Sequence, residues 1–396
     1  MDIKFKEDEN GKIIDSDELF DKIDGQIDND EFEAVVSEIL SIPREKWSNK
    51  LRFRLICAYN NLGEFDKSEE VLGEAAENIA SPNDAARCNY YRGHMCFMND
   101  REIMARKNYM KAAELDPEYA KEIDLEDDIN ECNRIISEDL AGFHALGASV
   151  CEDIKKRFAK SSEKRDISDE EFQMRLGFFP GIRKIPGFEH PMGFEKYFDE
   201  YKGEDRENCL KWFDDLYGIT DSESFFRHIQ TNLGCNLERT IYDVAAYLVG
   251  KPNFDIEKLD EVGRFAFEST SLFTGAFMEY LPKAGVLAWD ISEKIGFARH
   301  AHSCGIISNE DYCKGMLVLS DKARKGFSSW EDYMLSLIFG AGLYMFIMEE
   351  WSISAAGKFV LNMLPFLLNS DLADVVWHGA EDSGYDREKY KNTKKG

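Results

Sequence analysis

The feature that most constrains the fold of this 396-residue chain is an internal repeat near its N-terminus. Two windows align with each other, and both place aromatic, small and proline residues in a similar order. Small residues let two helices approach closely, aromatic residues fill the space between neighbouring pairs, and a proline ends the second helix. The windows therefore predict helix–turn–helix units. The residues concerned are Leu55, Tyr59, 62–66, Ser68, Ala75 and Pro82 in the first window, and Tyr91, Gly93, Ala105, Tyr109, Ala112, Ala113 and Pro117 in the second.

These windows resemble the tetratricopeptide repeat, a unit of about 34 residues. Ile56 stands where that repeat usually has a small glycine, and residues 100–103 replace its usual turn sequence. Residues 31–40 resemble a further second helix and residues 120–140 a polar capping helix, which together reach the number of units that a stable stack needs. The resemblance implies an N-terminal helical solenoid over residues 1–145 whose groove binds a protein or peptide.

In such repeats the first helix of each unit lines the concave groove. The matching positions in this sequence are the candidate partner-binding residues, although a solvated helix face explains the same pattern equally well. They are Lys50, Phe53, Asn60, Arg87, Tyr90 and His94.

The charge of the chain narrows its partners. It has 49 Lys and Arg against 76 Asp and Glu, a net charge of −27, and residues 1–140 carry −17 of it. Binding to nucleic acid needs clustered Lys and Arg, and anionic lipid also attracts basic segments. We therefore expect no nucleic acid and no membrane as partner, and we expect a protein partner with a basic surface.

Nine cysteines without a Cys-x-x-Cys pair indicate reduced thiols, and the N-terminus shows no signal peptide, so we expect a cytoplasmic protein. Residues 333–348 carry no charge. A membrane-spanning helix needs about 20 apolar residues, and this segment is flanked by acidic residues, so a buried core helix is expected. Membrane association through residues 333–368 is the alternative.

No alternation typical of strands occurs, so the sequence predicts an all-α fold. Residues 146–209 are expected to be a helical and Gly/Pro-rich connecting region, with an ordered loop at 177–193. Residues 210–378 are expected to form a second helical domain, and residues 379–396 a disordered tail. Sequences typical of helix caps begin at Thr220, Asp290, Ser308 and Ser328.

Residues 212–219 and 281–290, Ala298-Arg299, residues 301–308 and the box Ser329-Trp330-Glu331 follow one another in a distinctive order. This order resembles the bacterial family called domain of unknown function 1266, over roughly residues 210–350. The resemblance implies a bacterial origin, a mostly helical domain and no established reaction. Its motif residues of unknown role are Trp289, Asp290, Arg299 and Trp330, and the family's usual Arg is replaced by Glu293.

Asp290 and Arg299 are nine positions apart, about 180° around a helix, so they face opposite sides unless the helix begins after Asp290. A helix cap at Asp290 and a structural ion pair at Arg299 compete with a catalytic role. Trp289 and Trp330 are expected to be core anchors. His300 and Cys304 share a helix face with metal-ligand spacing, but two further ligands would be needed, so structural histidines are expected.

No phosphate-binding loop, nucleophile elbow, dinucleotide fingerprint or His-Glu-x-x-His motif is present, and no cofactor or metal is expected. The sequence therefore predicts a non-catalytic protein-interaction protein whose acidic repeat groove binds a partner. Two alternatives stay open. One is an immunity-type protein that neutralises a bacterial toxin, and the other is an enzyme that uses Asp290, Arg299 and His302.

Overall fold

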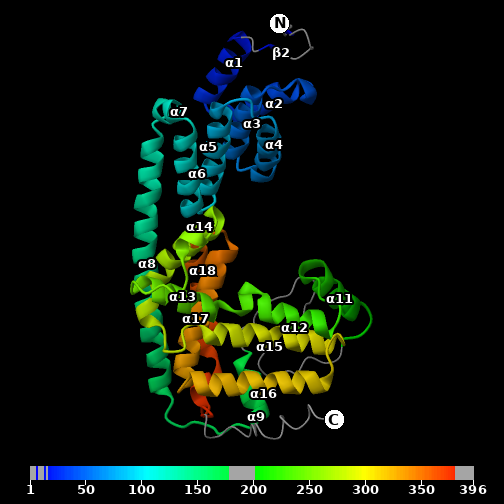
Figure 1. The fold of residues 1–396 in the computed structure, drawn as a ribbon, viewed down its shortest axis with the longest axis vertical. Helices are drawn as coiled ribbons and strands as arrows, with labels where there is room; N and C mark the ends of the chain where they lie inside the picture. Colours follow the sequence, from blue (N-terminus) through cyan, green and yellow to red (C-terminus); the bar gives the residue numbers. More distant parts are fainter. Residues whose placement is uncertain (1–5, 8–12, 15–16, 178–200, 380–396) are drawn as a thin grey trace. The chain divides into compact units, whose positions relative to one another are not determined.

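The computed structural model describes residues 6–7, 13–14, 17–177 and 201–379, and these ranges are mostly helical (Figure 1). The all-α class predicted from the sequence is confirmed. Within the described ranges, β-structure is limited to the two-residue strands β1 (Lys6–Glu7) and β2 (Ile13–Ile14), which pair with each other, and one isolated β-bridge. The predicted loop at 177–193 and tail at 379–396 lie outside the described residues, except for their first residues.

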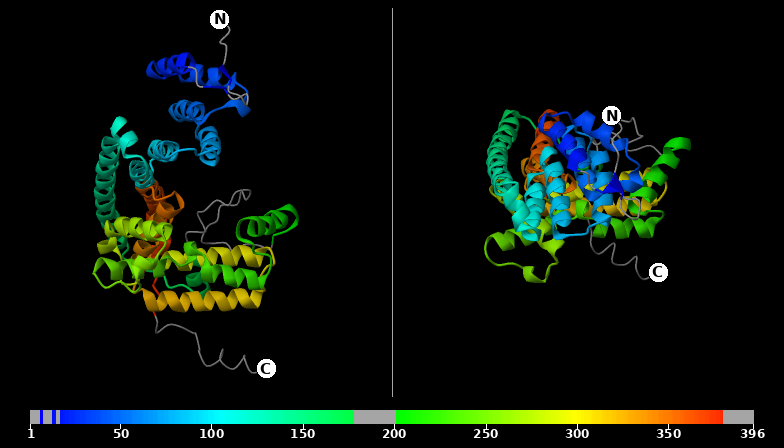
Figure 2. Two further views of the ribbon diagram at one scale, coloured as in Figure 1. Left: turned by 45° about the horizontal axis from the view of Figure 1, so that its top comes forward. Right: turned by 90° about the horizontal axis from the view of Figure 1, so that it is seen from above.

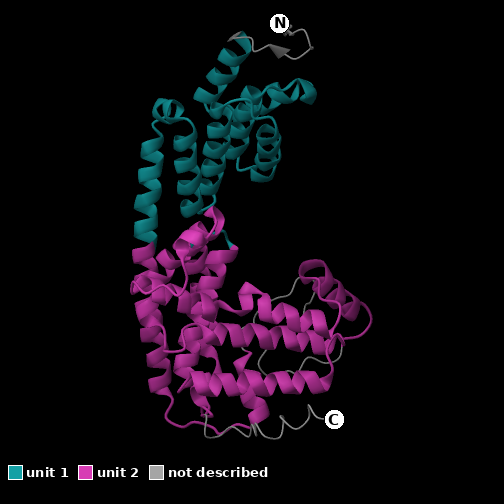
Figure 3. Ribbon diagram, in the orientation of Figure 1, with its two compact units in different colours: residues 1–139, 349–353 teal, residues 140–348, 354–396 magenta. Residues whose placement is uncertain are grey.

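Contacts divide the chain into two compact units, coloured separately in Figure 3. Unit 1 comprises residues 1–139 and 349–353, and unit 2 comprises residues 140–348 and 354–396. Each helix of unit 1 from α1 to α6 packs against the next one along the chain (Figure 2). These helices are α1 (Asp17–Asp28), α2 (Phe32–Leu40), η1 (Arg44–Lys46), α3 (Asn49–Asn61), α4 (Phe65–Glu77), α5 (Pro82–Met98), α6 (Glu102–Leu115) and α7 (Pro117–Glu122).

The starts of α3 and α5 follow from their capping residues. The Ser48 side chain accepts a hydrogen bond from the backbone N–H of Leu51 at the start of α3. Ser81 caps α5 in the same way, and Pro82 occupies the first turn, where its missing N–H costs nothing. Gly63 has a φ of +71° in the turn between α3 and α4, a conformation that glycine adopts without strain. The turn and the Ser81 cap are placed where the sequence predicts them.

The pair α5/α6 is held together at a glycine. A Cβ on Gly93 would lie 2.6 Å from the ring of Tyr109, which is buried on α6. Ala105 and Ala112 on α6 are also fully buried. The prediction that small residues stand where these two helices approach closely is therefore confirmed.

One long helix, α8 (Leu125–Lys160), corrects the expectation of a separate capping helix at 120–140. The chain turns at Asp124, with a φ of +51°, and then continues as a helix without interruption. This stretch contains no proline, and its glycines occur singly, so nothing in it ends a helix. The predicted domain boundary after residue 145 falls inside α8, whereas the units divide at 139/140.

Unit 2 is built around α15, whose residues are all buried except Lys294 and His302. α15 packs against α13, α16, α17 and α9. Besides the end of α8, the helices in the described part of this unit are α9 (Asp169–Leu176), α11 (Gly203–Tyr217), α12 (Ser222–Thr231), η2 (Leu233–Cys235), α13 (Leu237–Leu248), η3 (Ile256–Lys258), α14 (Glu261–Gly275), η4 (Met278–Tyr280), α15 (Leu287–Ser303), α16 (Asn309–Gly326), α17 (Trp330–Met348), α18 (Ile353–Asn369) and η5 (Asp371–Asp374).

The apolar helix α17 is a core element of unit 2. Among the described residues it alone has the length and composition to cross a membrane. Inside the protein, 67% of its apolar 18-residue stretch is buried. Gly340 on this helix lies against Trp289 of α15, where a Cβ would lie 2.4 Å from the Cβ of the tryptophan. Burial of the residues between Tyr333 and Leu343 agrees with the core helix predicted from the sequence.

Candidate functional site

Two of the six predicted groove residues, Phe53 and Asn60, are buried in the core of unit 1. Phe53 is 2% exposed, and its ring stacks on Tyr91 with the centroids 5.7 Å apart. Asn60 is fully buried, and its side-chain oxygen accepts a hydrogen bond of 2.5 Å from the Ser68 hydroxyl. A partner cannot reach either side chain, so the prediction is corrected here. Matching positions in the repeats identified these two residues, but they did not show that Phe53 joins a core cluster with residues of α1 and α2.

The remaining candidates on α5 form one partly exposed line, here called the α5 surface: Arg87, Tyr90 and His94. Intervals of three and four residues put these side chains on one face of the helix. The Tyr90 ring lies 5.7 Å from that of Tyr109 and 6.2 Å from that of Tyr119, measured between centroids. The Arg87 guanidinium lies 4.6 Å from the centre of the Tyr119 ring. These contacts pack Tyr90 against α6 and α7, and Arg87 against α7.

The aromatic part of the α5 surface is uncharged at neutral pH. Burial raises the pKa of Tyr90 to about 12, and the nearby Asp128 carboxylate acts in the same direction. Burial also lowers the pKa of His94, so its imidazole is neutral at pH 7. The sixth candidate, Lys50, is exposed on α3, with its ammonium group 5.7 Å from the centre of the Phe20 ring.

The motif residues Trp289 and Asp290 join α15 to the segment around η2 and α13. Trp289 is fully buried and donates its indole N–H to the carbonyl of Gly234 at 2.7 Å. Asp290 is 2% exposed, and its carboxylate accepts hydrogen bonds from the backbone N–H groups of Leu237 (2.7 Å) and Glu238 (2.8 Å). Asp290 therefore caps α13. The sequence predicted that it caps its own helix, but Asp290 lies inside the first turn of α15 and not before it.

The other two motif residues, Trp330 and Arg299, are also buried. Trp330 is 1% exposed, donates its N–H to the carbonyl of Val376 and packs edge-on against Trp377. The Arg299 guanidinium donates to the backbone carbonyls of Met174 (2.6 Å) and Gly177 (3.3 Å), which fixes the end of α9 to α15. Trp289 and Trp330 thus anchor the core.

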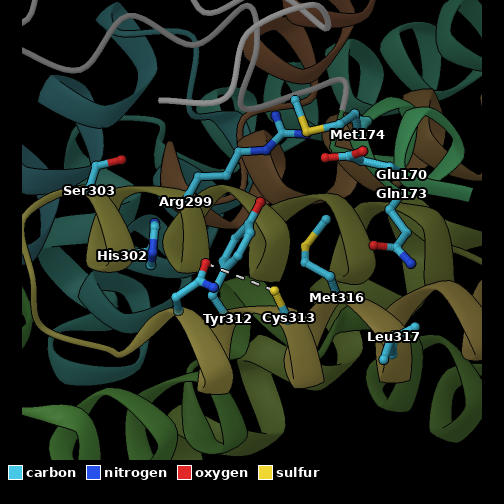
Figure 4. Close-up of a pocket in the computed structure, with 11 residues that line it drawn as sticks. Glu170, Gln173, Met174, Arg299, His302, Ser303, Tyr312, Cys313, Met316 and Leu317 are labelled. Carbon is cyan, nitrogen blue, oxygen red and sulfur yellow. Dashed lines mark hydrogen bonds between the residues drawn. The ribbon is translucent and has the colours of Figure 1, made fainter. Parts of the chain in front are cut away.

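A cavity of about 520 Å³ lies in unit 2 between α9, α15 and α16 (Figure 4). Arg299 and His302 line it, whereas Asp290 is not among its described lining residues. The three residues of the enzyme alternative are therefore not gathered around this cavity, in agreement with the half-turn that separates Asp290 from Arg299 on the helix.

The cavity contains further residues that the sequence did not single out, among them Glu170, Tyr312 and Met316. The His302 ring stacks on Tyr312, with centroids 5.0 Å apart. The lining as a whole comes from α9, α15 and α16, and α9 lies far from the other two along the chain, so local spacing does not reveal the cavity. In the sequence, the cavity was indicated by the closeness of Arg299 and His302.

His300 of α15 and Cys304, directly after this helix, are buried. Nδ1 of His300 lies 2.9 Å from the Tyr201 hydroxyl, and burial lowers the pKa of His300 to about 3. Cys304 is buried and contacts the carbonyl of Ala301. Within the described ranges, no three potential metal ligands among His, Cys, Asp and Glu come together.

Comparison with known proteins gives one result. Residues 213–351 match the model of a family described as "Protein of unknown function (DUF1266)". This match confirms the resemblance predicted for the C-terminal half and includes all four motif residues. No curated protein and no solved structure matches the chain.

Proposed function

We propose that this chain is a non-catalytic protein-interaction protein, and that the α5 surface of its acidic N-terminal unit binds a protein segment with a basic surface. The observation that carries the proposal is Tyr90, a partly exposed ring held by Tyr109 and Tyr119 and flanked by Arg87 and His94. Tyr and Arg are over-represented among residues that dominate binding energy, and a rigid side chain such as Tyr loses little entropy on binding.

The tetratricopeptide-like interpretation of unit 1 supports this role. The pairs α3/α4 and α5/α6 pack closely, and Gly93 occupies the close approach that the repeat reserves for a small residue. In a stack of such pairs, the first helix of each pair lines the groove, which makes α5 the expected contact helix. A preformed helical surface lowers the cost of ordering a bound segment.

The negative charge of the N-terminal region supports a partner with a basic surface. Residues 1–140 carry a net charge of −17, so a basic segment is attracted and an acidic one is repelled. All nine cysteines lie in the described ranges and none forms a disulfide, which supports a reducing compartment such as the cytoplasm. An immunity-type protein is one form of the same proposal, with a toxin as the basic partner.

The test is site-specific crosslinking of the full chain in its native host. A photoreactive phenylalanine analogue is placed at Arg87, and a matched control places it at Met110, an exposed residue of α6 that lies outside the α5 surface. We expect a protein with a basic surface to be crosslinked from position 87 and not from position 110. Equal crosslinking from both positions, or a partner with an acidic contact surface, would contradict the proposal. The identity of the crosslinked protein distinguishes a toxin from other partners.

A further inference from the structure

The unit 2 cavity belongs to no role described so far, and its lining combines a buried cation with an apolar wall. Its volume of about 520 Å³ falls within the roughly 300–1,000 Å³ typical of small-molecule sites. The lining residues come from α9, α15 and α16, all within unit 2. Any ligand bound here is therefore independent of the α5 surface.

The polar part of the cavity centres on Arg299. This residue is 2% exposed, and its guanidinium is positioned by the carbonyls of Met174 and Gly177. Tyr312 lines the cavity together with this residue. Burial lowers the pKa of Arg299, which means that burial disfavours its charged form. A negative charge placed in the cavity would offset that cost, and guanidinium groups pair well with carboxylates.

The cavity lining also contains apolar side chains. Figure 4 shows His302 and Ser303 on one side of Tyr312, and Met316 and Leu317 on the opposite side, together with Glu170 and Gln173. Met316 is buried, and Leu317 is half-buried on the next position of α16. The cavity thus combines the Arg299 cation with the apolar side chains of Met316 and Leu317, which fits an amphipathic molecule.

The charge of the ligand is limited by Glu170, whose carboxylate also lines the cavity. Its negative charge raises the pKa of Tyr312, although burial is the larger cause. A ligand with two negative charges would be repelled by Glu170 as it is attracted by Arg299. The lining therefore favours a single negative charge.

We propose that this cavity binds a small organic monocarboxylate with an apolar body. The carboxylate is held by Arg299 with Tyr312 and Ser303, and the apolar body contacts Met316 and Leu317. Octanoate is a suitable probe because it combines both features. Octanol tests the apolar body alone, inorganic phosphate tests the anion alone, and octyl phosphate tests a doubly charged head group.

The readout is the thiol of Cys313, which lines the cavity and is the exposed cysteine of the chain. Carbamidomethylation of the full chain is followed by mass spectrometry, with the half-buried Cys57 and Cys151 as internal references. We expect octanoate to slow modification of Cys313 at least threefold and to leave the reference thiols unchanged. Half-protection should need about tenfold less octanoate than octanol, since a charge-assisted hydrogen bond contributes roughly that factor.

Two variants test the location. Leu317→Trp fills the apolar part of the cavity and should abolish protection, whereas Val318→Trp changes the next, exposed residue, which does not line the cavity, and should preserve it. Neither substitution removes the structural hydrogen bonds of Arg299, and unchanged modification rates of Cys57 and Cys151 verify that each variant remains folded. Protection that survives Leu317→Trp, or that octanol gives as well as octanoate, would overturn the proposal.

The head group is tested separately. Octyl phosphate should protect more weakly than octanoate, and Glu170→Gln should reduce that difference, since it removes the repelling carboxylate. Stronger protection by octyl phosphate in the unsubstituted chain, or protection by inorganic phosphate alone, would overturn the assignment to monocarboxylates.

Discussion

Asp290 combines burial with two backbone hydrogen bonds, and its ionisation is therefore tied to stability. Burial raises the pKa of its carboxyl group to about 6 from an ordinary value of 3.8, although the N–H groups of Leu237 and Glu238 oppose that rise. Because the folded-state pKa is the higher one, the folded protein binds the proton more tightly. The resulting stabilisation is present at low pH and is lost as the pH rises through about 6.

We therefore expect the stability difference between the unsubstituted chain and Asp290→Asn to depend on pH. The advantage of Asp over Asn should be about 2 kcal/mol larger at pH 4.5 than at pH 7, as calculated from the two pKa values. Urea unfolding of both proteins at the two pH values measures this. Subtracting the unfolding free energies of the two proteins cancels the effect of the other titrating groups. An advantage of Asp over Asn that grows towards pH 7 would contradict the raised pKa of Asp290.

The cysteines differ in accessibility, which gives a second residue-scale prediction. Cys313 is exposed, Cys57 and Cys151 are half-buried, and the other six are buried. Burial also raises the pKa of Cys88 to about 11 and of Cys96 to about 11, which keeps these thiols protonated. We expect one fast-reacting thiol in the native chain and nine in urea, counted by titration with a chromogenic disulfide. A fast-reacting Cys88 or Cys96 would contradict the burial of the α5 core.

At the scale of elements, the pair α5/α6 depends on the absence of a side chain at position 93. Gly93→Ala would place a Cβ 2.6 Å from the Tyr109 ring, so the helices must separate or the ring must move. We expect a loss of about 1–3 kcal/mol in the free energy of unfolding, typical of overpacked cores.

The matched control is Gly73→Ala in α4, where nothing lies within 4 Å of the added Cβ. This change should stabilise the helix by about 0.5–1 kcal/mol, since alanine has the higher helix propensity. Denaturant unfolding, followed by far-ultraviolet circular dichroism, compares the two variants. Equal effects of both substitutions would show that α5 and α6 do not approach as closely as described.

Local signals predicted the elements of this fold well. Ser81 with Pro82 predicted the start of α5, and Ser308 caps α16 as its sequence suggested. The cap predicted at Thr220 is Asp221 instead, because the Ser224 side chain completes the box with Asp221. Capping sequences fix a helix start to within one residue, since neighbouring polar side chains compete for the same N–H groups.

Contacts between distant elements could not be predicted in the same way. Asp290 was expected to cap its own helix, but tertiary packing brings it to the first N–H groups of α13. Phe53 and Asn60 share a helix face with exposed residues and are nevertheless covered by their neighbours. The cavity is formed by α9, α15 and α16 together, so it has no sequence signature of its own.

At the scale of the whole molecule, two helical units have different chemical characters. Unit 1 lies in the most acidic part of the chain and presents the α5 surface, whereas unit 2 contains the family match and the cavity. The protein partner of unit 1 and the small anion bound by unit 2 are separate predictions. Either prediction can fail while the other holds. The attraction of a basic partner is electrostatic in part, so salt should weaken it.

The most direct test is the affinity of the crosslinked partner for the full chain, measured by calorimetry at 50 and 300 mM NaCl. We predict that Tyr90→Ala weakens binding by at least tenfold, as expected for a dominant contact residue, while Met110→Ala has no effect. We also predict weaker binding at the higher salt concentration. Thermal unfolding of Tyr90→Ala verifies that the chain remains folded. Unchanged affinity in a folded Tyr90→Ala protein, or affinity that does not depend on salt, would contradict a basic partner at the α5 surface.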